Sequence, residues 1–123
     1  MKLDSKTLAD AAQRIGIKEE ELSAVVDRGE AVSYQAGDYL FHESTPRLWL
    51  GLVIEGEIDL VRGQYGQSVL LSVAQPGAIL SEGVMLDDTP HGTSAVTRQG
   101  ASVWQIGQIA LYVAPGLRRA GAH

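Results

Sequence analysis

The chain has 123 residues, of which 45% are hydrophobic and 20% are charged, a composition typical of one soluble globular domain and too apolar for a disordered chain. Its formal net charge is −5, and its ten Lys and Arg residues are thinly spread, which excludes a basic stripe for direct nucleic-acid binding. The lack of cysteine excludes disulfides and thiolate metal sites, and neither an export leader nor a run of eighteen apolar residues occurs, so we expect a cytoplasmic protein.

Two amphipathic helices are predicted first along the chain. Over residues 4–15 apolar side chains recur at helical spacing, with Asp4 or Ser5 as the cap and Gly16 as the break. A second helix is predicted over residues 18–28, because three glutamates suit its positive end and Gly29 is well placed to stop it.

A β region is predicted from residue 31 to residue 106. Short runs rich in Val, Ile, Leu, Tyr and Trp alternate there with Gly, Pro, Asp and Ser, as in an all-β barrel or sandwich. One stretch breaks this rhythm, since residues 80–86 are predicted to form a single helical turn capped by Ser81. A brief helix is expected over residues 108–113. The predicted strands cover residues 31–34, 39–42, 48–54, 58–62, 68–74, 93–97 and 102–106.

Two segments of the β region carry a resemblance to a known family. Residues 36–46 read AGDYLFHESTP and resemble PGDxIFxEGDP, the opening hairpin of cyclic nucleotide-binding domains, with Ser44 where glycine is usual. Residues 50–58 read LGLVIEGEI and are similar to that family's LYxVLxGEV. The resemblance, which is to catabolite activator and fumarate/nitrate regulator-like sensor domains, implies a mainly β fold: a double-stranded β-helix or jelly-roll-like β-roll flanked by short N- and C-terminal helices.

A third similar segment implies a ligand site. Residues 75–86 read QPGAILSEGVML, followed by TPHGT at 89–93, where the family has PGDxFGE, an apolar residue and AL, followed by PRxA. In the family this cassette opens a short helix whose N–H groups meet a cyclic phosphate, a glutamate binds the ribose 2′-hydroxyl, and an arginine pairs with the phosphate. The resemblance also implies that two apolar side chains face the base of the nucleotide. The positions implied are Ser81, Glu82, Gly83, Val84, His91, Gly92, Thr93, Leu60 and Leu71.

Two of these positions depart from the family pattern. Ser81 replaces a glycine, which is mild where the backbone is not left-handed and supplies a helix cap. His91 replaces the arginine, and an imidazole is shorter, offers one donor toward a given oxygen and is largely neutral at about pH 7. Losing a charge-assisted hydrogen bond costs about 1.5–3 kcal/mol, so we expect cyclic AMP or cyclic GMP to bind weakly, in an acid-dependent way, or not at all.

Several of these residues also have an ordinary structural interpretation. Glu82 is typical of a helix-capping or dipole-facing acid. His91 lies between a proline and a glycine, as in an exposed turn, with a phosphate-facing or pH-sensing role as the alternative. Leu60 and Leu71 are typical of core positions in strands, and both interpretations can hold together. The tryptophans are expected to pack and not to stack on a ligand; they are Trp49 and Trp104.

These observations together predict a regulatory sensor domain and not an enzyme. It would bind a cyclic nucleotide or other small anion weakly or not at all, and signal through its C-terminal helices to an effector or partner. The expected parts are an N-terminal helix over 1–16, the β-roll over 17–116 and a truncated helix or tail over 117–123. The expected partners are a small nucleotide or anion, a second copy or a fused effector domain, with no nucleic acid, membrane or cofactor. No nucleophile, base and orienting group stand together, so no catalysis is expected.

Two other classes of function stay open as alternatives. The first is a ligand-free dimerisation or scaffold domain. The second is a cupin-like metal-dependent enzyme, which would also be a small β-barrel but would need several histidines and a glutamate around a metal. The three histidines are His42, His91 and His123, with no His-x-His pair among them, so no metal site is expected.

Overall fold

The computed structural model describes residues 4–81, 89–108 and 110. Helix α1 covers Ser5–Ile15, and its N-cap is Asp4, whose side chain accepts a hydrogen bond from the Thr7 amide at 2.7 Å. Its end is the left-handed Gly16, with φ of 88°. The first predicted helix is therefore confirmed. The helical turn predicted over 80–86 and the brief helix predicted over 108–113 fall for the most part outside the described residues.

Helix α2 covers Glu19–Val26 and ends three residues before Gly29. The prediction that Gly29 stops the helix is wrong, because the C-cap is Asp27. Gly29 serves a close approach instead: a Cβ atom there would lie 2.6 Å from the indole nitrogen of Trp104.

Eight strands form two four-stranded antiparallel sheets within the described residues. One sheet has the order β1-β8-β3-β6 and the other β2-β7-β4-β5. This mainly β roll confirms the predicted fold class. The two-residue strand β6 was not predicted, because a pair of residues after a turn carries no alternation to recognise. The strands are β1 Glu30–Tyr34, β2 Tyr39–Phe41, β3 Trp49–Gly56, β4 Ile58–Gln64, β5 Gln67–Ala74, β6 Ile79–Leu80, β7 Ser94–Val96 and β8 Ala101–Gly107.

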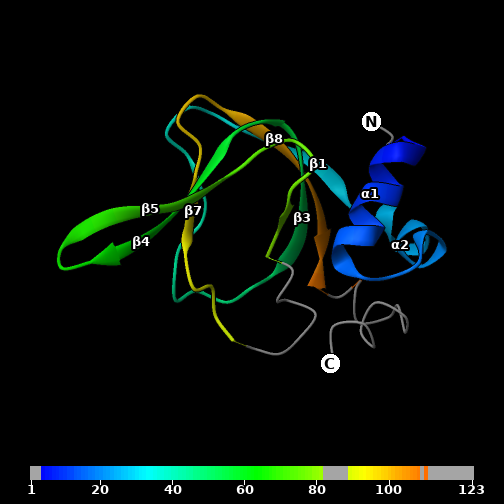
Figure 1. Cartoon of the computed structure of the whole chain (residues 1–123), viewed down its shortest axis with the longest axis horizontal. Coiled ribbons are helices and arrows are strands. Elements are labelled where there is room, and N and C mark those ends of the chain that lie inside the picture. Colours follow the sequence, from blue (N-terminus) through cyan, green and yellow to red (C-terminus); the bar gives the residue numbers. More distant parts are fainter. Residues whose placement is uncertain (1–3, 82–88, 109, 111–123) are drawn as a thin grey trace.

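The first sheet has a buried core on each of its faces. Alternate residues of a strand point to opposite faces, so Leu52 of β3 packs toward the helices while Val53 packs into the interior of the roll. On the helix side the indole N–H of Trp104 donates to the carbonyl oxygen of Val26 at 2.9 Å. Figure 1 shows α1 and α2 beside β1 and β8, with the β4–β5 hairpin extending away from the body on the opposite side.

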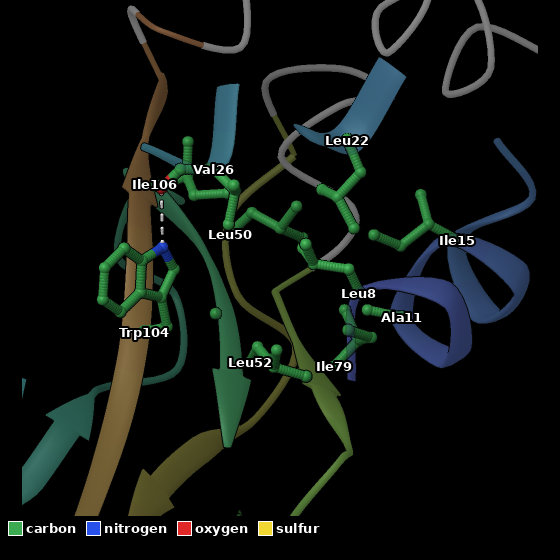
Figure 2. A pocket seen from close by; sticks show the side chains of 11 residues that line it. Leu8, Ala11, Ile15, Leu22, Val26, Leu50, Leu52, Ile79, Trp104 and Ile106 are labelled. Carbon is green, nitrogen blue, oxygen red and sulfur yellow. Dashed lines mark hydrogen bonds between the residues drawn. The ribbon is translucent and has the colours of Figure 1, made fainter. Parts of the chain in front are cut away.

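A small pocket of about 20 Å³ lies between the helices and the first sheet; we call it the helix-side pocket. Figure 2 shows Leu8 of α1 pointing toward Leu50 of the sheet, Ile15 beside Leu8 and Leu22, and the same hydrogen bond of Trp104. Such a volume is near the minimum for one water molecule, which also needs several polar partners. The lining side chains are apolar, so this pocket is a packing gap and not a ligand site. They belong to Leu8, Ala11, Ile15, Leu22, Val26, Leu50, Leu52, Ile79, Trp104 and Ile106, with Gly51 beside them.

Candidate functional site

Two segments far apart in the sequence are hydrogen-bonded to each other beside the second sheet. They are the loop between β2 and β3 and the residues that lead into β7. The amide of Ser44 donates to the carbonyl oxygen of His91 at 2.8 Å, and the amide of His91 donates to the carbonyl oxygen of Thr45 at 2.9 Å. The amide of Glu43 donates to Ser94 Oγ at 2.9 Å. These three bonds fix the loop against the segment that starts at residue 91.

A cavity of about 230 Å³ lies where these segments meet the strands; we call it the Arg47 cavity. Five of the residues predicted for the ligand site line it together, although they come from β4, the position after β6 and the segment before β7. Their role in binding stays a prediction. The predicted five are Leu60, Ser81, His91, Gly92 and Thr93, and the other lining residues are Phe41, Arg47, Ile79 and Leu80.

Two side-chain atoms of the Arg47 cavity are buried without a hydrogen-bond partner: Arg47 Nε and Ser81 Oγ. Buried polar atoms are nearly always paired, and leaving one unpaired costs about 1–3 kcal/mol. Both atoms are donors, since a guanidinium N–H can only donate and a hydroxyl can donate. Two residues of the cavity lining therefore carry an unused buried donor each.

His91 is buried, with 6% of its surface exposed, and its ring stacks on Phe41 at a centroid distance of 3.7 Å and an interplanar angle of 6°. The interpretation as an exposed turn histidine is therefore wrong. The backbone of His91 is hydrogen-bonded to the β2–β3 loop, which holds the residue against the fold. Burial lowers the pKa of His91, and the charge of Arg47 lowers it further. A neutral His91 cannot take over the role of an arginine near neutral pH.

Both serines that stand where the family has glycine adopt left-handed backbone. Ser81 has φ of 62° and Ser44 has φ of 67°. The replacement at Ser81 was expected to be mild if the backbone there is not left-handed, and that condition is not met. A left-handed non-glycine residue costs about 1–2 kcal/mol, so the pattern's preference for glycine has a steric reason at both positions.

Leu60 and Leu71 have different surroundings. Leu60 packs against the interior core and lines the Arg47 cavity, as predicted for a core residue. Leu71 is 48% exposed and lines no part of that cavity, so its interpretation as a core residue is wrong. The pairing of β4 with β5 shifts register where Leu60 faces Ser72 and Val61 faces Leu70, which leaves Leu71 unpaired.

Three predicted site residues, Glu82, Gly83 and Val84, lie outside the described residues. Most of the expected helical turn lies there too, but its predicted start is wrong: Leu80 belongs to β6, and Ser81 Oγ has no hydrogen-bond partner and so is not a helix cap. The assignments of those three residues stay predictions.

The two tryptophans pack as predicted. Trp104 is 8% exposed within the helix-side core, and Trp49 meets Phe41 edge-on at a centroid distance of 5.8 Å.

A second, larger cavity of about 330 Å³ lies at the start of β4, and no sequence motif pointed to it. Its charged groups are already paired: Arg98 Nε lies 2.5 Å from Asp59 Oδ2, and Glu57 Oε2 accepts a hydrogen bond from Gln75. No unpartnered buried side-chain atom of the described residues lines this cavity. The smaller Arg47 cavity is therefore the better candidate.

Arg47 is the cavity residue that sequence reasoning missed. It follows Pro46 directly and precedes the apolar start of β3. A lone cation between a turn and an apolar strand could have been singled out, but only the fold shows that the β2–β3 loop lies beside residue 91.

A metal centre and a membrane span find no support in the part of the chain that the structure describes. No three His, Cys, Asp or Glu side chains among those residues gather as metal ligands. None of the helices there is long and apolar enough to cross a membrane.

A family model described as the cyclic nucleotide-binding domain matches residues 31–112 of the chain. The match includes the β2–β3 loop and both sides of the Arg47 cavity. A search of curated proteins finds no match.

Solved structures share the fold at low sequence identity. The cAMP-bound regulatory domain of Toxoplasma gondii PKA is 18% identical with a TM-score of 0.75, over 92% of this chain and 46% of that one. The N-terminal domain of a Streptomyces coelicolor A3(2) transcriptional regulator is 24% identical with a TM-score of 0.75, over 96% of this chain and 87% of that one. The sensor domain of the Pseudomonas aeruginosa transcriptional regulator DNR is 18% identical with a TM-score of 0.72, over 94% of this chain and 81% of that one. The chain spans 42% to 54% of the length of several solved relatives.

Proposed function

Because the chain belongs to the cyclic nucleotide-binding domain family, we propose that it is a regulatory sensor domain, not an enzyme, and that the Arg47 cavity receives a small anionic ligand. The ligand class is a cyclic nucleotide such as cyclic AMP or cyclic GMP, or another small phosphate-bearing anion. The fold of a cyclic nucleotide-binding regulatory domain and the cAMP named for the Toxoplasma relative support this class.

One observation carries the proposal. Five residues that the family pattern implies as ligand contacts line one cavity, and two residues of the same lining carry unused buried donors. Polar groups placed beside apolar side chains fix the orientation of a bound small molecule, and this lining combines both kinds. The described part of the second cavity offers no such unused donor.

The affinity is expected to be low. His91 stands where the family pattern has arginine, is stacked on Phe41, and has a pKa lowered by burial. The cavity of about 230 Å³ is also smaller than the roughly 300–1,000 Å³ of typical drug-sized sites. Both features favour a small anion, or the phosphate part of a nucleotide, over a tightly held whole nucleotide.

A thermal-shift titration tests this proposal. The full chain is titrated with cyclic AMP, cyclic GMP, cyclic dinucleotides and inorganic phosphate, at about pH 5.5 and about pH 7.5. A ligand at about 100 times its Kd should add about 2.7 kcal/mol of stability. Sodium chloride at matched ionic strength is the control for screening. Melting temperatures that none of the phosphate compounds raises above this control would contradict the proposal.

A docking role is a second candidate, favoured by a specific surface. Four apolar side chains of β5 are 37% to 48% exposed, and Tyr65 in the adjoining turn is 97% exposed. Strand β5 is an edge of its sheet, and unpartnered apolar edges favour association with another chain. In this view the domain dimerises or acts as a scaffold without a ligand. A stable dimer by light scattering, with a melting temperature that no phosphate compound moves, would support it. The four are Val69, Leu70, Leu71 and Val73.

Signalling is the last part of the proposal. A sensor passes on ligand binding when its conformations differ in ligand affinity. The C-terminal helices expected after β8 are the proposed output to a fused effector, a partner or a second copy. Limited proteolysis with and without ligand should show altered cleavage after residue 108, whereas cleavage unchanged at saturation would contradict this route.

A further inference from the structure

Arg47 carries a hydrogen-bond donor that has no acceptor. Its Nε atom is buried without a partner, and Arg47 belongs to neither of the ion pairs found among residues 4–81, 89–108 and 110. Those pairs join Lys6 to Asp10 and Arg98 to Asp59. The carboxylate of Glu43, in the same β2–β3 loop, is already engaged, because its Oε1 accepts a hydrogen bond from the Gly63 amide at 2.8 Å. Among the described residues, the Nε–H of this guanidinium thus has no acceptor.

The β2–β3 loop holds Arg47 in a fixed place. The amide of His91 donates to the carbonyl oxygen of Thr45, two residues before Arg47, and Thr45 Oγ1 donates to the carbonyl oxygen of His42 at 2.5 Å. Pro46 fixes the backbone angle between Thr45 and Arg47. The backbone that carries Arg47 is therefore held against the same segment that supplies His91, Gly92 and Thr93 to the cavity. A group held in place before binding loses less entropy when a ligand arrives.

Ser81 supplies a second hydrogen-bond donor, from a different segment of the chain than Arg47. Its hydroxyl is buried and unpaired, and the residue lines the same cavity directly after β6. A strained backbone and an unused hydroxyl at one residue are both unfavourable unless something else benefits from them. An oxyanion placed between Arg47 and Ser81 would accept from both and remove both unpaired donors.

We propose that Arg47 and Ser81 form the anion-binding pair of this domain, and that Arg47 provides, from the β2–β3 loop, the positive charge that His91 does not. The ligand group is a phosphate oxyanion, either free or within a cyclic nucleotide. This inference rests on the proposed function, because it names the groups that would hold the anion of that ligand. The lowered pKa of His91 agrees with it, since the charge of Arg47 is one of its causes.

The test measures the affinity of the full chain for inorganic phosphate and for cyclic AMP by calorimetry. Arg47→Met removes the donors and the charge while keeping an unbranched side chain, and it should weaken binding at least about tenfold. Arg47→Lys keeps the charge without the planar guanidinium, so its affinity should lie between those of the wild type and Arg47→Met. Ser81→Ala should weaken binding by about three- to tenfold. Arg28→Met is the matched control, because Arg28 is exposed and lines no part of the cavity; it should leave the affinity within about twofold.

Folding is checked on each variant by circular dichroism and by melting temperature. Arg47 has no hydrogen-bond partner to lose at Nε, so Arg47→Met should melt no lower than the wild type. The Arg47→Lys variant keeps the test decisive if Arg47→Met fails to fold.

The outcomes separate this inference from the proposed function. Wild-type binding that Arg47→Met and Arg47→Lys both leave unchanged would overturn the Arg47 assignment while the sensor proposal stands. Phosphate binding that depends on Arg47, without cyclic AMP binding, supports the anion pair and overturns the cyclic nucleotide. Absence of binding by every phosphate compound overturns both.

Discussion

The helix-side pocket and the Arg47 cavity share Ile79 as a wall, but the groups around them differ in kind. Around the first, apolar side chains close to about 20 Å³, and the indole N–H of Trp104 is paired with a backbone carbonyl. Around the second, about 230 Å³ stays open, with two unpaired donors and a strained serine. The packed side chains on the helix side of the first sheet thus stabilise the fold, whereas polar groups near its other side have no hydrogen-bond partner. Departures from a satisfied core are expected where a protein binds something.

The largest effect is expected from breaking the helix-side core. Trp104→Ala removes a buried ring and its hydrogen bond to Val26, so the free energy of unfolding should fall by about 3–5 kcal/mol. Urea denaturation measures this, and the molecules that remain folded should keep the wild-type affinity for phosphate. A loss below about 1 kcal/mol would contradict the division between the two regions.

Ser81→Gly is expected to act in the opposite direction on stability. It relieves the left-handed backbone at φ of 62° and removes the buried unpaired hydroxyl, so the ligand-free protein should gain about 1–2 kcal/mol. The same change removes a proposed anion donor, so phosphate affinity should fall. Denaturant midpoints and calorimetry on one sample measure both. A variant that gains stability and keeps its full affinity would remove Ser81 from the site.

Ser44→Gly is the matched comparison for that effect. Ser44 is left-handed at φ of 67° but is exposed and lines no part of the Arg47 cavity. Only the backbone strain is relieved, so a smaller gain of about 0.5–1 kcal/mol is expected, with affinity unchanged. An equal gain at both serines would show that the unpaired hydroxyl of Ser81 costs nothing.

The smallest effect is a pH dependence. The pKa of His91 is lowered in the folded chain, first by burial and then by Arg47, so the unfolded chain binds more protons once the pH falls through about 6.5. The contribution of His91 to stability is therefore complete above that pH and is lost below it. His91→Phe keeps a ring to stack on Phe41 and should lose less stability than the wild type between about pH 7 and pH 5.

The control for this pH effect is His42→Phe, at an exposed histidine that stacks on Tyr39. Unfolding curves at several pH values should show the acid sensitivity reduced by the change at His91 and kept by the change at His42. Equal pH profiles for the wild type and His91→Phe would contradict the stated cause.

The sequence predicted the architecture because its signals are local. Turn residues and alternating apolar residues placed seven strands close to their observed bounds, and the capping residue Asp4 fixed the start of α1. Leu71 was misplaced because alternation cannot tell whether a second layer covers a strand, and a register shift leaves it exposed. His91 was misread because its burial depends on pairing with residues 44 and 45, which lie far away in sequence.

The candidate site was predicted in part for the same reason. The family pattern brought Leu60, Ser81 and His91 to attention, and the fold places all three around one cavity. The pattern could not point to Arg47, because a cation that reaches the cavity from another loop leaves no mark in the cassette itself.

The most direct measurement is a ¹⁵N NMR titration of the full chain with inorganic phosphate and then with cyclic AMP. The side-chain Nε–H resonance of Arg47 and the amide resonances of Gly92 and Thr93 should shift and saturate together, while the indole N–H of Trp104, already bonded to Val26, should stay in place. An Arg47 Nε–H resonance that does not move while other signals saturate would contradict the account.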